Sequence, residues 1–300
     1  MARSKNTSII AGFVVRSTRK VPSYTHPGAF SSSLRRPRES ENSMAKIICI
    51  ANQKGGVGKT TTAINLGASL AVAERRTLLV DMDPQGNAGS GVGVERGVLR
   101  ENIYNALIDD AEMAGVVKKT EIPLLDVIPS SDDLAGAELE LVTMPERERR
   151  LARSLEAIAG EYAYILLDCP PSLGLLTLNA MTAAHSVLVP LQCEFYAMEG
   201  LSKILNTIRL VKKGLNPALA VEGILLTMYD GRNNLSRQVS EEIRNHFGET
   251  TFRTVIPRNV RLSEAPSHGK PILLYDINSR GAAGYLELAR EIVEREVKNG

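Results

Sequence analysis

Short apolar runs alternate with longer amphipathic stretches along this 300-residue chain from Lys46 onward. Most of the runs lack polar alternation, which is typical of parallel strands that helices cover on both faces. The runs of strand length are IICIA (47–51), TLLVD (77–81), LLDVIPS (124–130), YILLD (164–168), SVLVP (186–190), EGILLT (222–227) and RTVIP (253–257). The pattern predicts an α/β fold in which helices flank both faces of a mostly parallel β-sheet.

Five stretches between these runs have clear helical patterns, at residues 60–73, 147–160, 199–213, 237–247 and 284–297. In the first of them, Ala63, Leu66 and Leu70 follow the i, i+3, i+7 spacing of a buried helix face. Crossovers between parallel strands are right-handed, so the loops that follow the strands are expected along one edge of the sheet. Functional residues are therefore expected at that edge.

The first 43 residues differ in charge from the remainder. They contain eight Lys or Arg and two Glu, a net charge of +6, whereas the whole chain has +2, so residues 44–300 carry −4. This Ser- and Arg-rich segment lacks periodicity and is predicted to be a disordered extension. A start placed too early, with Met44 as the true start, is favoured over a basic DNA-binding arm or a transit peptide. One domain is expected over residues 44–300.

A glycine-rich segment, IANQKGGVGKTTT (50–62), lies between the first apolar run and the first helical pattern. Strand, glycine loop and helix form the context of a phosphate-binding loop, and they predict the P-loop NTPase fold. The loop's backbone N–H groups and the following helix N-terminus suit phosphate oxygens, with Lys59 on the β- and γ-phosphates and Thr60 on Mg²⁺. ATP and Mg²⁺ are the expected cofactors. The expected cofactor-binding residues of this loop are Lys54, Gly55, Gly56, Val57, Gly58, Lys59, Thr60 and Thr61.

The loop departs from the usual pattern G-x-x-x-x-G-K-[ST], because Gln53 stands where the first glycine should be. What remains is K-G-G-V-G-K-T, with an additional lysine, Lys54, at the mouth of the loop. This is the deviant Walker A motif, and in it the chain resembles the ParA/MinD group of ATPases. The resemblance implies that Lys54 crosses a dimer interface to the nucleotide of the other subunit. A glycine turn with chance lysines is disfavoured, because six residues match in the right context.

Aspartates end two of the apolar runs. Asp81 and Asp83 follow a buried run in LLVDMDPQGN, and Asp168 ends YILLD. Beside a phosphate loop, Asp168 is interpreted as the Walker B residue that holds the water shell of Mg²⁺, although alone it could be an ordinary strand-end cap. By its match to the family segment D-x-D-P-Q-G-N, Asp83 is expected to position the attacking water. The role of Asp81 stays open and includes a structural one.

Other segments separate the members of the group. Iron–sulfur carriers and nitrogenase iron proteins need paired cysteines, whereas Cys49, Cys169 and Cys193 are scattered, so buried packing in a reduced cytoplasm is expected. A MinD-like protein should end in a basic amphipathic helix. Residues 284–300 instead contain four Glu, which predicts a packed final helix and no stable membrane association. No run approaches the roughly 20 apolar residues that cross a bilayer, so a soluble, cytoplasmic protein is expected.

Four longer segments resemble ParA proteins specifically, and the resemblance covers nearly all of residues 44–297. They are IPSSDDLAGAELEL (128–141), LQCEFYAMEGL (191–201), TMYDGRNNLSRQV (227–239) and TVIPRNVRLSEAPSHGKPILLYD (254–276). By this match, Arg232 and Arg261 are expected to contact DNA phosphates, with surface salt bridges as the alternative. Pro257 and Asn259 match the adenine-side loop of the family.

The resemblance to short ParA/Soj-type proteins implies a DNA-partitioning ATPase. ATP would close a homodimer that binds double-stranded DNA without sequence specificity, and a ParB-like centromere-binding partner would stimulate hydrolysis. The expected setting is the nucleoid, during segregation of a chromosome or plasmid. A ParA-like ATPase that positions a protein cargo is the leading alternative, and a MinD-like membrane-cycling ATPase ranks behind both.

Overall fold

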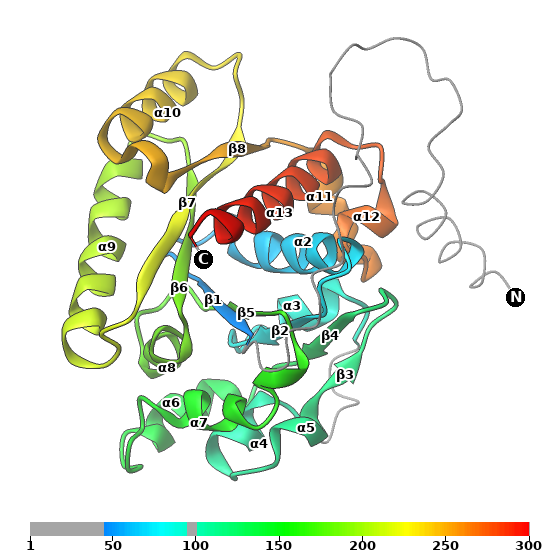
Figure 1. Ribbon diagram of the computed structural model, residues 1–300, viewed down its shortest axis with the longest axis vertical. Helices are drawn as coiled ribbons and strands as arrows, with labels where there is room; N and C mark the ends of the chain where they lie inside the picture. The colour runs from blue at the N-terminus through cyan, green and yellow to red at the C-terminus, as the bar shows by residue number, and fades with distance from the viewer. Residues whose placement is uncertain (1–44, 95–100, 300) are drawn as a thin grey trace, which may run out of the picture. The chain divides into compact units, whose positions relative to one another are not determined.

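The computed structural model describes residues 45–94 and 101–299, which we call the described residues. The disordered extension expected at residues 1–43 and the proposed start at Met44 lie outside them. Eight strands are found in the described residues (Figure 1). Their bounds are β1 Lys46–Ile50, β2 Thr77–Asp81, β3 Lys118–Lys119, β4 Leu125–Ile128, β5 Tyr164–Asp168, β6 Ser186–Gln192, β7 Ala220–Tyr229 and β8 Thr251–Pro257.

These strands form one sheet in the order β3-β4-β2-β5-β1-β6-β7-β8. Neighbouring strands are parallel except for the pair β3 and β4. The register sets Asp168 of β5 opposite Ile50 of β1 on one side and opposite Asp81 of β2 on the other. The carboxyl ends of three adjacent strands therefore lie level, and the loops that follow them share one edge of the sheet.

Helices cover both faces of this sheet (Figure 1). The α-helices are α2 Lys59–Val72, α3 Asn87–Gly91, α4 Ile103–Ile108, α5 Met113–Val116, α6 Leu134–Leu141, α7 Arg150–Glu156, α8 Leu175–Ala183, α9 Ala197–Gly214, α10 Asn234–Phe247, α11 Val260–Glu264, α12 Ile272–Tyr275 and α13 Arg280–Asn299. Three short 3-10 helices are η1 Ala159–Glu161, η2 Gly248–Thr250 and η3 Ala265–His268. Strand side chains alternate between two apolar cores, one under α4–α10 and the other under α2, α3 and α11–α13.

The predicted α/β fold with a mostly parallel sheet is confirmed. All seven predicted runs contain or overlap strands, namely β1, β2 and β4–β8. The short strand β3 was not predicted, because Lys118 and Lys119 carry no apolar signal. The helix predicted over residues 147–160 was too long, since α7 ends at Glu156 and η1 follows. Helix α8 was missed because it is buried on most sides and has no amphipathic pattern.

The last helix, α13, packs into the core, as its sequence predicted. Tyr285, Leu288 and Ile292 are buried in the cluster that also contains residues of α2 and β8. The hydroxyl groups of Tyr285 and Thr62 of α2 lie 3.2 Å apart, within hydrogen-bond distance. Among the described residues, no helix combines the length and apolar character that a membrane crossing requires.

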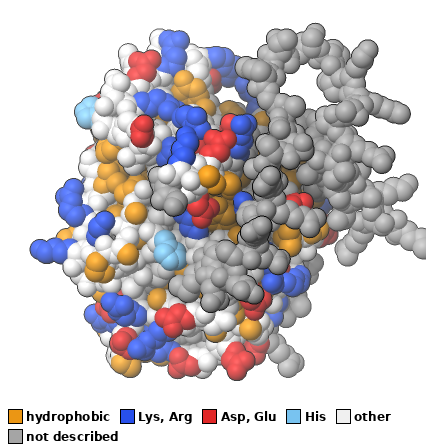
Figure 2. Space-filling model, viewed as in Figure 1, with side chains coloured by type: hydrophobic (Ala, Val, Ile, Leu, Met, Phe, Trp, Pro, Cys, Tyr) orange, Lys and Arg blue, Asp and Glu red, His pale blue; other side chains and the backbone are white. Residues whose placement is uncertain are grey.

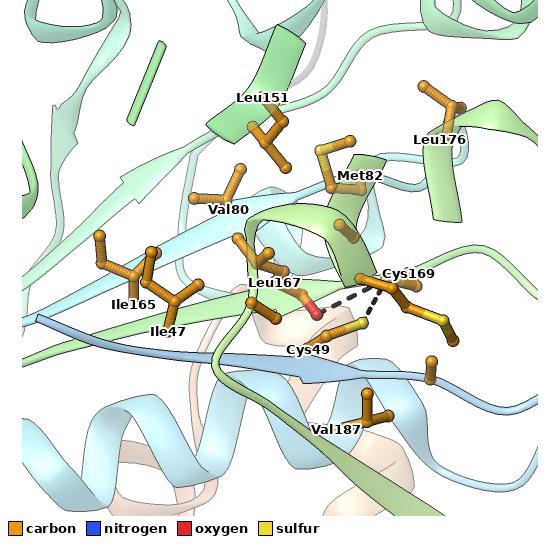
Figure 3. Packing of buried hydrophobic residues seen from close by; sticks show 14 of the residues in the cluster. Ile47, Cys49, Val80, Met82, Leu151, Ile165, Leu167, Cys169, Leu176 and Val187 are labelled. Carbon is orange, nitrogen blue, oxygen red and sulfur yellow. Dashed lines mark hydrogen bonds between the residues drawn. The ribbon is translucent and has the colours of Figure 1, made fainter. Parts of the chain in front are cut away.

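The carboxyl ends of β1 and β5 meet in a tightly packed part of the core (Figure 3). Cys49 of β1 and Cys169, which directly follows β5, are buried free thiols whose Sγ atoms lie 3.4 Å apart. Cys193 is a third buried thiol. The prediction that Cys169 and Cys193 are small buried residues is confirmed. This packing fixes the two strand ends that carry the site.

Candidate nucleotide site

The loop between β1 and α2 has a conformation that suits phosphate. Gly56 and Gly58 have φ angles of 74° and 86°, in the left-handed region that glycine adopts without strain. Helix α2 begins at Lys59, directly after Gly58. A Cβ atom added at Gly55 or Gly56 would meet no atom within 4 Å, so the loop borders open space. An open glycine loop at a helix N-terminus is an arrangement that binds phosphate oxygens.

Two side chains that the sequence reasoning missed hold this loop in place. Asn52 donates a hydrogen bond from Nδ2 to the carbonyl of Pro190 in β6 (2.7 Å), and its Oδ1 accepts from the Lys54 N–H (3.0 Å). Thr227, near the end of β7, donates to the carbonyl of Val57 (2.8 Å). The loop is therefore tied to β6 and β7. A polar residue between a strand and a glycine run was a usable signal for Asn52, whereas Thr227 had none.

Lys59 is buried at the start of α2. Its Nζ donates to the carbonyl of Lys54 (3.3 Å), so the side chain turns back along the loop. Burial lowers the pKa of Lys59, while the carboxylates of Asp168 and Asp83 act to raise it. The structure thus brings together the predicted phosphate-binding lysine and both predicted acidic residues.

Asp168, at the end of β5, is a fully buried carboxylate. Neither of its oxygens accepts a well-formed hydrogen bond from the described part of the chain. Burial and the neighbouring Asp81 raise the pKa of Asp168 well above its ordinary value, and the nearby side chains of Thr60 and Lys59 act against this. A buried carboxylate without partners is unfavourable. A cation placed beside it would remove that penalty.

Asp81 and Asp83 have different surroundings although they are two residues apart. Asp81 is buried and accepts from the backbone N–H groups of Asp83 (3.2 Å), Ala88 (2.9 Å) and Gly89 (3.0 Å). Burial raises the pKa of Asp81 to about 7 in spite of these hydrogen bonds. The contacts of Asp81 hold the start of α3, a structural role. Asp83 is also buried, but its Oδ1 accepts from a single backbone N–H group, that of Gln85 (2.9 Å).

Lys54 lies at the mouth of the loop, as the sequence predicted. Its side chain is 46% exposed and forms an ion pair with Glu194, which is 45% exposed. Glu194 follows β6, so this contact spans the edge of the sheet from the phosphate loop to the segment before α9. No sequence pattern predicted this role for Glu194, although it lies within the ParA-like segment 191–201.

A cavity of about 490 Å³ opens beyond the ends of β7 and β8. Its lining brings Pro257 and Arg232 together with two further arginines. The lining residues are Tyr229, Asp230, Gly231, Arg232, Pro257, Arg258, Val260 and Arg280. Asn259 does not line it; instead its Oδ1 accepts from the Arg261 N–H (2.9 Å) and caps α11. Through Thr227, the strand that leads to this cavity also contacts the phosphate loop.

The two arginines expected to contact DNA are exposed and already make ion pairs. Arg232 pairs with Asp230 (2.9 Å), and Arg261 pairs with Glu264 (2.8 Å) and Asp276 (3.5 Å). Exposed pairs of this kind contribute little to stability and exchange readily. Basic and acidic side chains are interspersed on the face shown in Figure 2, so that face has no uniformly basic field.

These residues fit a nucleotide with a divalent cation. The open glycine loop, the buried Lys59 and the unsatisfied Asp168 meet at one edge, and the Thr60 side chain is near the Asp168 carboxylate. No group of three or more His, Cys, Asp or Glu in the described residues forms a ready metal site. A cation held by Thr60 and near Asp168 would therefore need further oxygen ligands, which phosphate groups and water provide.

Comparisons with known proteins agree with this geometry. A family model described as an AAA domain matches residues 45–221. The chain is 60% identical over 253 residues to the chromosome partitioning protein ParA of Myxococcus xanthus, covering 84% of this chain and 89% of that protein. It is 60% identical over 249 residues to the sporulation initiation inhibitor protein Soj of Bacillus subtilis, covering 83% and 98%.

A solved structure from Mycobacterium smegmatis has a closely similar fold. It is described as cobyrinic acid a,c-diamide synthase with a bound ATP analog and magnesium. The TM-score is 0.75 and the identity 36%, with 85% of this chain and 97% of that chain covered. That structure therefore has its nucleotide and magnesium on a fold shared across most of both chains.

Proposed function

Because this chain belongs to the ParA/Soj family of chromosome-partitioning ATPases, we propose that it uses ATP to close a homodimer that binds DNA without sequence specificity. The chain is an ATPase. The observation that carries the proposal is the open glycine loop with Lys54 at its mouth, beside the buried and unsatisfied Asp168. The nucleotide and Mg²⁺ bound by the M. smegmatis neighbour support the same ligands here.

Within one subunit, residues 54–61 hold the phosphates of ATP. The backbone of the glycine loop surrounds them, and Lys59 balances the charge of the β- and γ-phosphates. Thr60 and Asp168 are the residues that would hold Mg²⁺, Thr60 through its hydroxyl and Asp168 through bound water. When bound, Mg²⁺ neutralises charge that develops on the phosphate oxygens. Asp83, which follows β2 at the same edge of the sheet, orients the water that attacks the γ-phosphate.

The adenine ring is assigned to the cavity beyond β7 and β8. Pro257 offers an apolar ring surface there, and the cavity volume is within the range of small-ligand sites. The contact of Thr227 with the phosphate loop supports this placement, because the same strand continues to the cavity. Asn259 contributes by capping α11 and so fixing the turn after Pro257.

Dimerisation depends on Lys54. In one copy its ammonium group is paired with Glu194 in an exposed contact that costs little to break. ATP on a second copy offers a stronger partner, because a triphosphate carries several negative charges. Each Lys54 then reaches the nucleotide of the other subunit, and ATP occupancy becomes a condition for pairing.

DNA binding follows from pairing. Two copies present twice the number of exposed arginines, including Arg232 and Arg261, and phosphate contacts made together raise the affinity. Because phosphates carry no sequence information, binding is insensitive to sequence and falls with salt. A ParB-like centromere-binding protein is proposed to stimulate hydrolysis, and the nucleoid is the proposed location.

Sizing by light scattering tests the dimer. With Mg²⁺ and a non-hydrolysable ATP analogue, the wild-type chain should have twice its nucleotide-free mass. Lys54→Ala should bind the analogue and remain a monomer. Lys203→Ala, which removes another exposed ion pair, should dimerise normally. A single-copy mass for the wild type in every nucleotide state would overturn the proposal.

DNA retention tests the remaining steps. Asp83→Ala should bind ATP, turn it over slowly and stay on DNA as a dimer. Arg261→Glu should dimerise with ATP and lose DNA, while Arg290→Glu, a comparably exposed ion-paired arginine of α13, should keep it. Simultaneous loss of dimer and DNA in Arg261→Glu would show instead that this arginine is structural.

A further inference from the structure

Two neighbouring aromatic side chains face water at the edge that carries the nucleotide site. Phe195 is 75% exposed and Tyr196 is 67% exposed, and their ring centroids lie 5.1 Å apart with the rings nearly perpendicular. They are the only aromatic residues among the exposed large hydrophobic side chains of the described residues. Exposed aromatic pairs are unfavourable in water and are common at the centres of interfaces. We therefore expect another molecular surface to cover Phe195 and Tyr196.

The turn that holds the pair is well fixed. Cys193 and Ala197 on either side are buried in the core, so the two rings between them are directed outward. The Ala197 N–H donates to the carbonyl of Glu194 (2.9 Å) and closes the turn. Few side-chain and backbone states are lost when such a surface is covered, which favours binding.

The position of the pair connects it to the phosphate loop. Glu194, the residue before Phe195, forms the ion pair with Lys54. A second contact joins the loop to α9, because Gln53 Nε2 donates to Thr207 Oγ1 (3.5 Å). Any surface that covers the mouth of the loop would therefore also meet the aromatic pair.

We propose that Phe195 and Tyr196 are the apolar centre of the contact between two copies of this chain, an inference that rests on the proposed ATP-dependent dimer. In a two-fold contact the same surface meets itself, so it must be self-complementary. This surface carries one half-exposed cation, Lys54, one half-exposed anion, Glu194, and two apolar rings. Opposite charges and apolar rings can each find their counterpart on a second copy.

Closure around ATP then has two parts. Lys54 leaves Glu194 for the other subunit's nucleotide, and the two aromatic rings that follow Glu194 in the chain become buried against the second copy. Burial of four rings in the dimer supplies apolar contact area that the charged groups alone do not. Nucleotide specificity thus comes from Lys54, and much of the affinity between copies comes from the rings.

Tryptophan fluorescence tests this directly, because the chain contains no tryptophan. Phe195→Trp is a conservative change that adds a single fluorophore. Its emission should shift to shorter wavelength when Mg²⁺ and a non-hydrolysable ATP analogue are added, and should not shift in the combined variant with Lys54→Ala. Leu210→Trp, at an exposed position further along α9, is the matched control and should not respond. A dimer by mass without a shift in Phe195→Trp would overturn the inference.

Affinity provides the second measurement. The double variant Phe195→Ser, Tyr196→Ser should weaken dimerisation about 100-fold or more, while single copies bind the nucleotide analogue as the wild type does. Leu210→Ser should dimerise normally. If the double variant dimerises normally and loses only stimulation by a ParB-like partner, the surface belongs to that partner and the inference is wrong. If Lys54→Ala dimerises as well, the proposed function itself fails.

Discussion

Two buried carboxylates, Glu291 of α13 and Asp168 of β5, have opposite surroundings. Glu291 accepts hydrogen bonds from the backbone N–H groups of Arg253 (2.9 Å) and Thr254 (2.9 Å), from the Thr254 hydroxyl (2.7 Å) and from Arg295 (2.9 Å). Burial acts to raise the pKa of Glu291, but these donors outweigh it and hold the pKa below its ordinary value. Asp168 has no such partner among the described residues, and its pKa is raised.

The different hydrogen bonding of these two carboxylates distinguishes a structural residue from a candidate functional one. The donors around Glu291 come from β8 and from its own helix, so this carboxylate joins α13 to the edge of the sheet. Asp168 lies among three adjacent strand ends, and the side chains that favour its charged form, Thr60 and Lys59, both belong to the start of α2 beside the phosphate loop. A carboxylate that the fold leaves unsatisfied at the site marks the place where a ligand completes the chemistry.

The largest effect on stability is expected at Glu291. The carboxylate of Glu291 accepts four hydrogen bonds, and Glu291→Gln replaces one of its oxygens with an NH₂ group that faces N–H or O–H donors. The free energy of unfolding should therefore fall by about 3 kcal/mol. Urea denaturation would measure the loss. The exposed Glu287→Gln on the same helix is the control and should change the free energy of unfolding by less than about 0.5 kcal/mol. Equal losses in the two variants would show that the contacts of Glu291 add nothing specific.

The converse result is expected at Asp168. Asp168→Asn keeps the shape of the side chain but removes the charge, so ATP hydrolysis should fall about 10- to 100-fold. The free energy of unfolding without nucleotide should be unchanged or higher, because an unsatisfied buried carboxylate is removed. Steady-state ATPase assays and urea denaturation of the same preparation measure both. If Asp168→Asn lost as much stability as Glu291→Gln, Asp168 would be a structural residue, and the proposed contrast between the two carboxylates would be wrong.

Local sequence pattern indicated the candidate site where one short segment carries the chemistry. The glycine loop with Lys59 follows one apolar run and Asp168 ends another, and the parallel register of β1 and β5 brings them together. The partners of these residues were less visible. Thr227 and Glu194 reach the loop from β7 and from the turn after β6, and no local spacing relates such distant residues.

The environment of buried side chains could not be predicted from sequence pattern either. Asp81 and Asp83 look alike in sequence, yet three backbone N–H groups bind the Asp81 carboxylate and, among the described residues, only that of Gln85 binds the Asp83 carboxylate. Helix α8 has no amphipathic stripe because tertiary packing buries it on most sides. Contacts made by the fold as a whole, rather than by a periodic pattern, decide these cases.

The stabilisation provided by ionised Glu291 should be lost at acidic pH. Its folded pKa is lower than the ordinary value of 4.5, so the unfolded chain binds a proton more readily. The stabilisation is therefore complete above the unfolded pKa and is lost as pH falls through the folded pKa. Between about pH 5 and pH 3, the free energy of unfolding of the wild type should fall more steeply than that of Glu291→Gln. The difference in free energy of unfolding between the two proteins should therefore become smaller than it is at neutral pH. Parallel pH profiles of the two proteins would contradict the assigned role.

The smallest effect is expected from Arg295→Lys, which distinguishes the charge near Glu291 from the geometry of its donors. Arg295 donates to Glu291 and to the Thr251 carbonyl (3.2 Å), and its guanidinium lies 4.3 Å from the centre of the Phe252 ring. Lysine keeps the positive charge but loses the planar fork and the stacking, so the free energy of unfolding should fall by about 0.5–1 kcal/mol. Urea denaturation near neutral pH resolves such a change. A loss as large as that of Glu291→Gln would mean that Arg295, rather than the backbone donors of β8, is the main partner that Glu291 requires.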